Sequence, residues 1–213
     1  MTTATEAVVL LGFSAIKSLA ISSHTSRLLN GALPGYGLQQ GELWRHSIAV
    51  AFTARRLAVE IKLAPVEEAF VAGLLHDIGK TILSSYMENA FDEVTRIAQE
   101  RRMPFHEVET ELLGFDHAEL GAQVAAAWSF PPELEEAIRY HHSPHDATLK
   151  PALAHCVHLA DAACMMLGVG LGVDGMMYAI DPESMEILGV DGTRLQRLME
   201  DVAPLMSGEV IGA

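Results

Sequence analysis

The sequence predicts an all-α fold, and three of its features support this prediction. Apolar residues recur at intervals of three and four along almost the whole chain, and no stretch alternates convincingly with a period of two. Half of the 213 residues are hydrophobic and only 20% are charged, so the chain can fill a sizeable core. Glycine and proline lie between the periodic segments, where they end or begin helices. We therefore expect a helical bundle.

Three helices are expected in the N-terminal part of the chain. The first covers residues 5–22, because one of its faces carries an apolar stripe of Val8, Leu11, Ala15 and Leu19. A Gly- and Pro-rich loop over residues 30–37 separates it from a long helix over residues 39–62. Pro65 begins the third helix, which carries the tract His76-Asp77-Ile78-Gly79-Lys80.

Shorter helices are expected in the rest of the chain. Asp116 caps one of them, with Glu119 three residues later as in a capping box. Pro131 opens a helix that ends at His142, and Pro151 opens one that ends at Leu167. The remaining helices are expected over residues 88–101 and 104–113 and, as a small C-terminal cap, over residues 182–189 and 192–205.

The charge balance narrows the class of ligand. The chain has 14 basic and 28 acidic residues, and its net charge of −14 argues against a protein that grips nucleic-acid phosphates through a basic face. A small phosphorylated molecule or a nucleotide is compatible with this charge, since a metal ion and one or two local cations can hold it. We expect no nucleic-acid partner.

Cysteine usage and hydropathy predict a cytoplasmic protein that does not contact a membrane. No apolar run reaches the roughly 18 residues that span a bilayer, and the apolar start over residues 7–20 has no cationic leader before it. Cys156 and Cys164 lie eight residues apart on a predicted helix. That spacing, about 12 Å along the axis, is too long for a disulfide. A reducing compartment is therefore expected.

The pair His76-Asp77 is the most informative feature of the chain. Apolar runs over residues 69–75 and 81–83 flank it, so it is expected to be buried. A buried imidazole and carboxylate cost several kcal/mol unless they are compensated, and a divalent metal ion is one compensator. Because neighbours on a helix point about 100° apart, other helices must complete such a site. A buried polar network without metal is the alternative.

Further polar residues interrupt apolar faces elsewhere. Glu42 and His46 are separated by four residues, so they lie on one face of the long helix. Asp161 lies in the apolar tract of residues 156–163, where an unpaired carboxylate would be costly. Five predicted helices offer such inward-facing groups, which is how helical bundles build metal sites in their cores. The other members of this set are His117, His141 and His142.

These residues resemble a known family. The order of His46, His76-Asp77 and Asp161 is similar to the ligand set of the HD superfamily of metal-dependent phosphohydrolases. Several phrases resemble its HDOD subgroup: Leu43-Trp44-Arg45-His46-Ser47, Gly73-Leu74-Leu75-His76-Asp77-Ile78-Gly79-Lys80, His117-Ala118-Glu119-Leu120-Gly121-Ala122, Ala137-Ile138-Arg139-Tyr140-His141-His142 and His158-Leu159-Ala160-Asp161. The resemblance predicts an HDOD-type helical domain over residues 1–170, with the opening helices of the family module missing, and a C-terminal cap over residues 171–213.

The resemblance also implies roles for individual residues. Lys80 would face a phosphate, Asp77 would bridge two metal ions, and Asp161 would complete the metal shell and orient a water molecule. Arg45 and Arg139 flank ligands and are candidates for contact with an anionic substrate. The implied metal ligands are Glu42, His46, His76, Asp77, His117, His141, His142 and Asp161. Mixed imidazole and carboxylate ligands suit one or two divalent transition-metal ions, namely Mn, Fe, Ni, Co or Zn.

The related HD-GYP subgroup of cyclic dinucleotide phosphodiesterases differs from this chain at one place. After His141-His142 the chain reads Ser143-Pro144-His145-Asp146, without a Gly-Tyr-Pro signature. Two functions therefore stay open in addition to the structural network. One is a phosphohydrolase acting on a nucleotide or another phosphoester in bacterial signalling. The other is a non-catalytic scaffold that binds metal or a nucleotide.

The remaining histidines and the first helix give two further expectations. His24, His106, His145 and His155 are expected at the surface or at helix ends. Since the opening helices of the module are expected to be missing, the apolar stripe of the first helix needs another cover. This is a second copy of the chain, a separate protein, or the C-terminal cap over residues 188–206.

Overall fold

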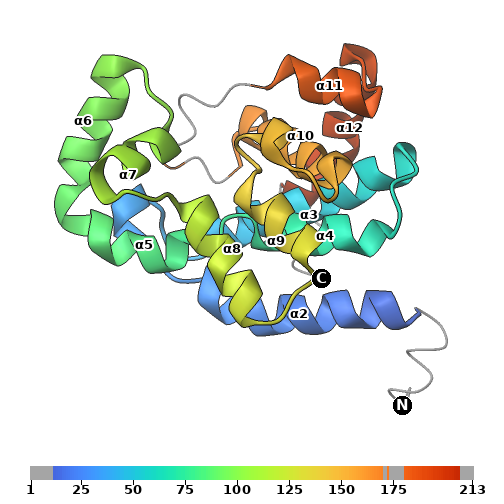
Figure 1. Cartoon of the computed structure of the whole chain (residues 1–213), viewed down its shortest axis with the longest axis horizontal. Helices are drawn as coiled ribbons and strands as arrows, with labels where there is room; N and C mark the ends of the chain where they lie inside the picture. The colour runs from blue at the N-terminus through green and yellow to red at the C-terminus, as the bar shows by residue number, and fades with distance from the viewer. Residues whose placement is uncertain (1–11, 170–171, 173–179, 207–213) are drawn as a thin grey trace.

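The computed structural model describes residues 12–169, 172 and 180–206, and Figure 1 shows their arrangement. These residues form helices and short 3-10 turns, with one isolated bridge between Leu33 and Leu38 and no strand among them. The all-α prediction is thus confirmed. The helices are α2 (Phe13–Leu29), α3 (Glu42–Glu60), α4 (Val66–Leu75), α5 (Lys80–Met87), α6 (Phe91–Arg101), α7 (Phe105–Leu113), α8 (His117–Ala127), α9 (Pro132–Arg139), α10 (Pro151–Met166), α11 (Pro182–Leu188) and α12 (Gly192–Met206). Across the described ranges, no helix has the length and apolar character that a membrane span requires.

The core is built around α10. Every residue from Leu153 to Met165 in this helix is buried. Helix α10 packs on α3, α4 and α9, and α3 packs along α4. In Figure 1, α6 and α7 lie at one end of the molecule and α11 and α12 at the other, with α10 between them. Side chains that point inward from α3, α8 and α10 therefore meet in the middle of the fold.

The first helix extends further than predicted. Helix α2 ends at Leu29, whereas the sequence indicated an end at residue 22, and residues 5–11 lie outside the described residues. The polar run after Ile21 favoured an early end. Instead, the hydroxyls of Ser22, Thr25 and Ser26 donate hydrogen bonds to carbonyls three or four residues earlier in the same helix. Thr25 and Leu29 are buried, so the inner face continues to the end of the helix.

The helix that was expected to carry His76 is broken at that residue. Helix α4 ends at Leu75 and α5 begins at Lys80. Between them, the N–H of Ile78 donates to Leu75 and that of Lys80 to Asp77, which makes two tight turns. Gly79 has no side chain to separate this turn from α8, and a Cβ there would collide with the carbonyl oxygen of His117. His76 and Asp77 thus lie at the junction of α4 and α5, where both side chains are buried.

The C-terminal helices attach to the body of the molecule and leave Leu19 of the first helix exposed. Helix α11 packs on α10, and α12 packs mainly on α3. Leu19 on α2 stays 56% exposed, so the expectation that the C-terminal cap covers this stripe is wrong at Leu19. Val8 and Leu11 of the stripe, and the predicted domain boundary at residues 170–171, lie outside the described residues.

Candidate metal centre

Seven of the eight sequence-predicted ligands meet in the interior. His46 comes from α3, His76 and Asp77 from the turn after α4, His117 from the first residue of α8, and Asp161 from the middle of α10. His141 and His142 follow the end of α9. Their ligand atoms form three overlapping groups, within each of which all atoms lie within 4.8 Å: His46 with His76 and Asp161, His76 with Asp77 and His141, and His117 with His141 and His142. Six of the seven side chains are buried, and His142 is half-buried.

One half of the cluster consists of His46, His76 and Asp161. Nδ1 of His46 lies 3.1 Å from the carbonyl oxygen of Val169, and Nδ1 of His76 lies 2.7 Å from that of Gly73. Because a carbonyl can only accept, each Nδ1 carries the proton and each Nε2 is turned to the cluster. Nε2 of His46 lies 3.0 Å from Oδ1 of Asp161. Burial alone would lower the pKa of His46, but Asp161 and Asp77 outweigh it and raise this pKa.

The other half consists of His117, His141 and His142. Nδ1 of His141 lies 2.7 Å from the carbonyl oxygen of Ile138, whereas Nδ1 of His117 lies 2.7 Å from the Glu109 carboxylate. Burial alone would lower the pKa of His117, but the charge of Glu109 dominates and raises it to about 10. Burial and the neighbouring His76 and His117 hold the pKa of His141 well below its usual value.

Asp77 lies between the two halves. Its carboxylate oxygens are 3.4 Å from Nε2 of His76 and 3.2 Å from Nε2 of His117. Nζ of the buried Lys80 lies 2.7 Å from Oδ2 of Asp77. Burial alone would raise the pKa of Asp77, but Lys80 and His76 hold it well below the usual value. Asp77 is therefore an ionised carboxylate within reach of ligands on both sides.

The donor atoms fit a divalent metal ion. Nε2 of His76 and Nε2 of His141 are buried and have no hydrogen-bond partner within the part of the chain that the structure describes. Leaving a buried polar atom unsatisfied costs about 1–3 kcal/mol. Imidazole nitrogens and carboxylate oxygens together are the donors that Mn, Fe, Co, Ni and Zn prefer. The two nitrogens point into the cluster, where bound metal ions would satisfy them.

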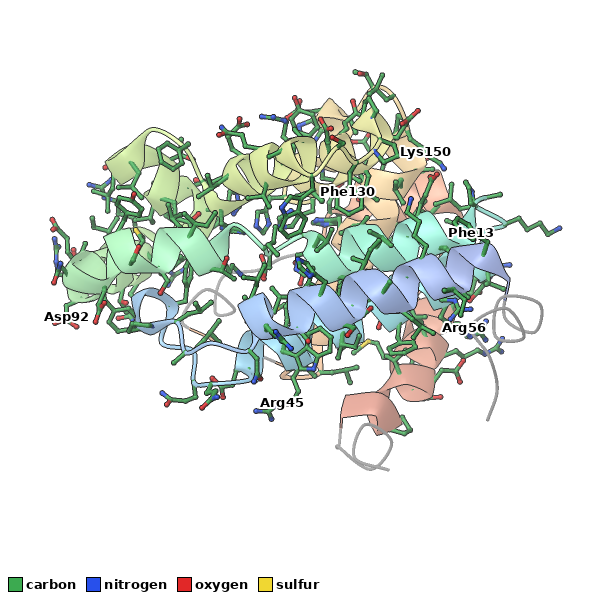
Figure 2. All side chains as sticks on the ribbon, turned by 90° about the horizontal axis from the view of Figure 1, so that it is seen from below. Phe13, Arg45, Arg56, Asp92, Phe130 and Lys150 are labelled. Carbon is green, nitrogen blue, oxygen red and sulfur yellow. The ribbon has the colours of Figure 1, made fainter. Side chains whose placement is uncertain are left out.

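Three other predicted site residues are not members of these three ligand groups. Oε2 of Glu42, at the start of α3, accepts a hydrogen bond of 2.7 Å from the backbone N–H of Gln39, and Glu42 belongs to none of the three ligand groups. Arg45 is exposed and points away from the body of the molecule in Figure 2. Arg139 forms an ion pair with Glu119.

Sequence reasoning missed Glu109 and misplaced one histidine, His155, whereas His106 lies at the start of α7 as expected. Glu109 is fully buried and lies one helical turn after Phe105, on the apolar face of α7, which is the signal that could have found it. His155 is buried and lies 2.8 Å from Oγ of Ser184 in α11, so its predicted surface position is wrong. His106 is half-buried and stacks on His142 with ring centroids 4.1 Å apart. Burial and the charge of His117 lower the pKa of His106 to about 4.

The chain is similar to bacterial proteins of known sequence. It is 29% identical over 142 residues to an uncharacterised protein of Treponema pallidum, which is 66% of this chain and 27% of the relative. It is 33% identical over 122 residues to ribonuclease Y of Geotalea uraniireducens, which is 56% of this chain and 17% of the relative. The matched region is thus about a quarter or less of the length of these relatives.

Solved structures share the fold. A Geobacter sulfurreducens HDOD domain protein of unknown function has a TM-score of 0.79 at 23% identity, covering 97% of this chain and 74% of its own. A candidate phosphohydrolase from Shewanella amazonensis has a TM-score of 0.73 at 25% identity, covering 98% and 77%. A candidate signal transduction protein from Marinobacter aquaeolei has a TM-score of 0.71 at 25% identity, covering 92% and 46%.

The match to a protein family covers more of the chain than either relative does. The model of the HDOD domain family matches residues 1–144 of the 213, a range that contains His46, His76-Asp77 and His117 as well as the His141-His142 pair. This is more than half of the chain. The chain therefore belongs to the HDOD domain family.

Proposed function

We propose that the protein is a metal-dependent phosphohydrolase that acts on a nucleotide or another phosphoester. The observation that carries this proposal is the buried cluster of seven His and Asp side chains, in which Nε2 of His76 and of His141 lack hydrogen-bond partners among the described residues. The names of two similar proteins, a candidate phosphohydrolase and a ribonuclease, support a phosphoester as the substrate class. The net charge of −14 favours a small phosphoester over a long RNA.

Different residues of the cluster would have different roles in this reaction. His46, His76 and Asp161 would hold one ion, and His117, His141 and His142 would hold a second, with Asp77 between them. Divalent ions at such a centre polarise a phosphoryl oxygen and lower the pKa of a water molecule. Asp161 would orient that water. Lys80 lies beside the centre and would meet charge that develops on the phosphate. The half-buried His142 marks the side from which a substrate would approach.

Metal analysis combined with a substrate screen tests this proposal. Protein purified without chelator should contain at least one transition-metal ion per chain. Nucleotides, cyclic dinucleotides and nitrophenyl phosphoesters should then be offered with Mn, Fe, Co, Ni or Zn. We expect metal-dependent release of phosphate or of an alcohol by the wild type, and its loss in Asp161→Asn. A protein without metal would contradict the proposal and would favour the polar network.

A non-catalytic signalling scaffold is the second candidate function. The Lys80 ammonium, assigned to the phosphate, is buried and lies 2.7 Å from Asp77, so its charge already has a partner. One structural neighbour is named as a candidate signal transduction protein. A protein that binds metal, or that binds a nucleotide in equilibrium dialysis, but turns over none of the phosphoesters would support this second function.

A further inference from the structure

Glu109 lies directly behind the half of the cluster that contains His117. Its carboxylate is fully buried and accepts three hydrogen bonds. Oε2 accepts from the backbone N–H of His117 at 2.8 Å and lies 2.7 Å from its Nδ1, while Oε1 accepts from the hydroxyl of Tyr36 at 2.7 Å. One carboxylate thus fixes both the first peptide of α8 and the ring of a candidate ligand.

This contact determines which nitrogen of His117 is available. Since the ionised carboxylate can only accept, Nδ1 of His117 carries a proton. Nε2 is therefore the nitrogen that can bind a metal after losing its proton, and it lies 3.2 Å from Oδ1 of Asp77 and 2.9 Å from Nε2 of His142. A carboxylate behind a ligating histidine fixes its ring and raises its basicity, and its loss typically costs 10–100-fold in metal affinity.

The two halves of the cluster differ in where the nearby negative charge comes from. The group of His46, His76 and Asp161 contains a carboxylate, whereas the group of His117, His141 and His142 consists of imidazoles alone. His46, His76 and His141 each place Nδ1 against a backbone carbonyl, which is neutral. His117 places it against Glu109. Glu109 thus places a carboxylate in direct contact with the all-histidine group, which otherwise relies on the shared Asp77.

We propose that Glu109 is a positioning residue for one of two metal ions, the ion held by His117, His141 and His142, and that the ion at His46, His76 and Asp161 does not depend on it. This inference rests on the metal centre of the proposed function. Tyr36 supports Glu109 from the other side, because its hydroxyl holds Oε1 and its buried ring lies edge-on to His117, with centroids 6.3 Å apart.

A titration of metal-free protein with Co²⁺, followed by its visible absorption and by elemental analysis, tests the inference. The wild type should bind two ions. Glu109→Gln keeps the size of the side chain and removes its charge. It should retain one ion with an affinity within about twofold of the wild type and bind the second about 10–100-fold more weakly. Tyr36→Phe should weaken the second ion by about two- to tenfold, since it loses one hydrogen bond while Glu109 remains.

Glu136→Gln is the matched control. Glu136 is also a buried carboxylate that accepts backbone hydrogen bonds, but its partners are Thr148, Leu149 and Lys150 and no candidate ligand. This variant should bind two ions as the wild type does, even if it unfolds at a lower temperature. A purely structural role for Glu109 predicts instead that both Gln variants behave alike.

The possible outcomes separate this inference from the proposed function. Unchanged binding of both ions by Glu109→Gln, or an equal loss of both, would overturn the role of Glu109. A wild type that binds a single ion would overturn it as well. A wild type that binds none would overturn the proposed function. If circular dichroism shows that Glu109→Gln is unfolded, Tyr36→Phe decides, and an unchanged second ion in that variant would count against the inference.

Discussion

Apolar side chains are usually buried in proteins and ionisable side chains are usually exposed. The interior of the bundle has buried ionisable residues, whereas the outer side of α2 has exposed apolar residues. Inside, seven ionisable residues from α3, α8, α10 and the segments after α4 and α9 lie together. Outside, α2 leaves Phe13, Leu19 and Leu28 exposed by 75%, 56% and 46%, and Figure 2 shows Phe13 at the end of this helix on the near side of the molecule. Isolated exposed apolar residues are common, whereas buried charges are not. The buried ionisable residues of the interior are therefore stronger evidence for a bound ligand than the exposed apolar residues of α2 are.

Glu136 shows how a buried carboxylate is accommodated without a ligand. It lies in α9 and accepts from the backbone N–H groups of Thr148, Leu149 and Lys150 at 2.6, 2.7 and 3.1 Å. These donors belong to the segment before α10, so the carboxylate joins two helices. The Nε2 atoms of His76 and His141 have no such partners among the residues described. The contrast indicates that the cluster is arranged to bind something, while Glu136 is arranged for stability.

Removal of Asp77 is expected to have the largest effect. Asp77→Ala takes away the carboxylate between the two halves of the cluster and should lose most of the bound metal. Metal binding stabilises the native state by about 2.7 kcal/mol when its concentration is 100 times the dissociation constant. Thermal unfolding with and without metal should therefore show a shift in the wild type and almost none in the variant. Comparing each protein with its own chelated form separates this effect from the general destabilisation caused by the loss of the ion pair between Asp77 and Lys80. A variant that is stabilised by metal as strongly as the wild type would refute the role of Asp77.

Lys80 tests whether the interior also performs chemistry. If its charge stabilises the phosphate in the transition state, Lys80→Ala should lower turnover about 100-fold or more while the metal content stays near that of the wild type. Lys17→Ala, at an exposed lysine of α2, is the control and should leave turnover unchanged. An equal loss of metal and of activity would mean that Lys80 acts only by holding Asp77.

The fold and most of the cluster could be predicted because they depend on local patterns. Helical periodicity and the proline positions indicated most of the helices, and Asp116 accepts from the N–H of Glu119 as its capping pattern predicts. His46 and Asp161 stood out because they interrupt apolar faces. The all-α fold and the HDOD family, both predicted from the sequence, are confirmed.

The remaining features depend on contacts between segments that are distant in sequence. At the break between His76 and Lys80, Gly79 approaches α8 so closely that a side chain there would collide with it. His155 is buried and its Nδ1 lies 2.8 Å from Oγ of Ser184 in α11. Glu42 shares a helical face with His46 in the pattern, but the first turn of α3 uses its carboxylate for the N–H of Gln39. Periodicity carries no information about such partners.

Glu136 is expected to give a smaller, pH-dependent effect. Burial alone would raise the pKa of Glu136, but the N–H groups of Thr148, Lys150 and Leu149 lower it below the usual value. A carboxyl group whose pKa is lower in the folded state stabilises the fold above its unfolded pKa of about 4.3, and this contribution is lost as the pH falls through the folded pKa. Glu136→Gln should thus reduce the free energy of unfolding at pH 7 by about 1–3 kcal/mol. Urea denaturation should show that the difference narrows in acid, and a pH-independent difference would contradict this origin.

The outer face of α2 gives the smallest expected effect, because it concerns association and leaves the fold intact. We propose that the side of α2 that carries Leu19 packs against a second copy of the chain, since Leu19 remains exposed after α11 and α12 have packed elsewhere. Burying a leucine contributes about 1.5–3 kcal/mol, so Leu19→Glu should weaken self-association at least tenfold. Light scattering over a range of concentrations should show a wild-type mass that rises towards that of a dimer and a variant that stays monomeric.

Ile187→Glu is the matched control, because Ile187 is 48% exposed on α11, which lies away from α2 in Figure 1. This control should associate as the wild type does. A wild type that stays monomeric at high concentration would exclude the dimer, and equal weakening by both variants would mean that added charge, and not the α2 face, is responsible.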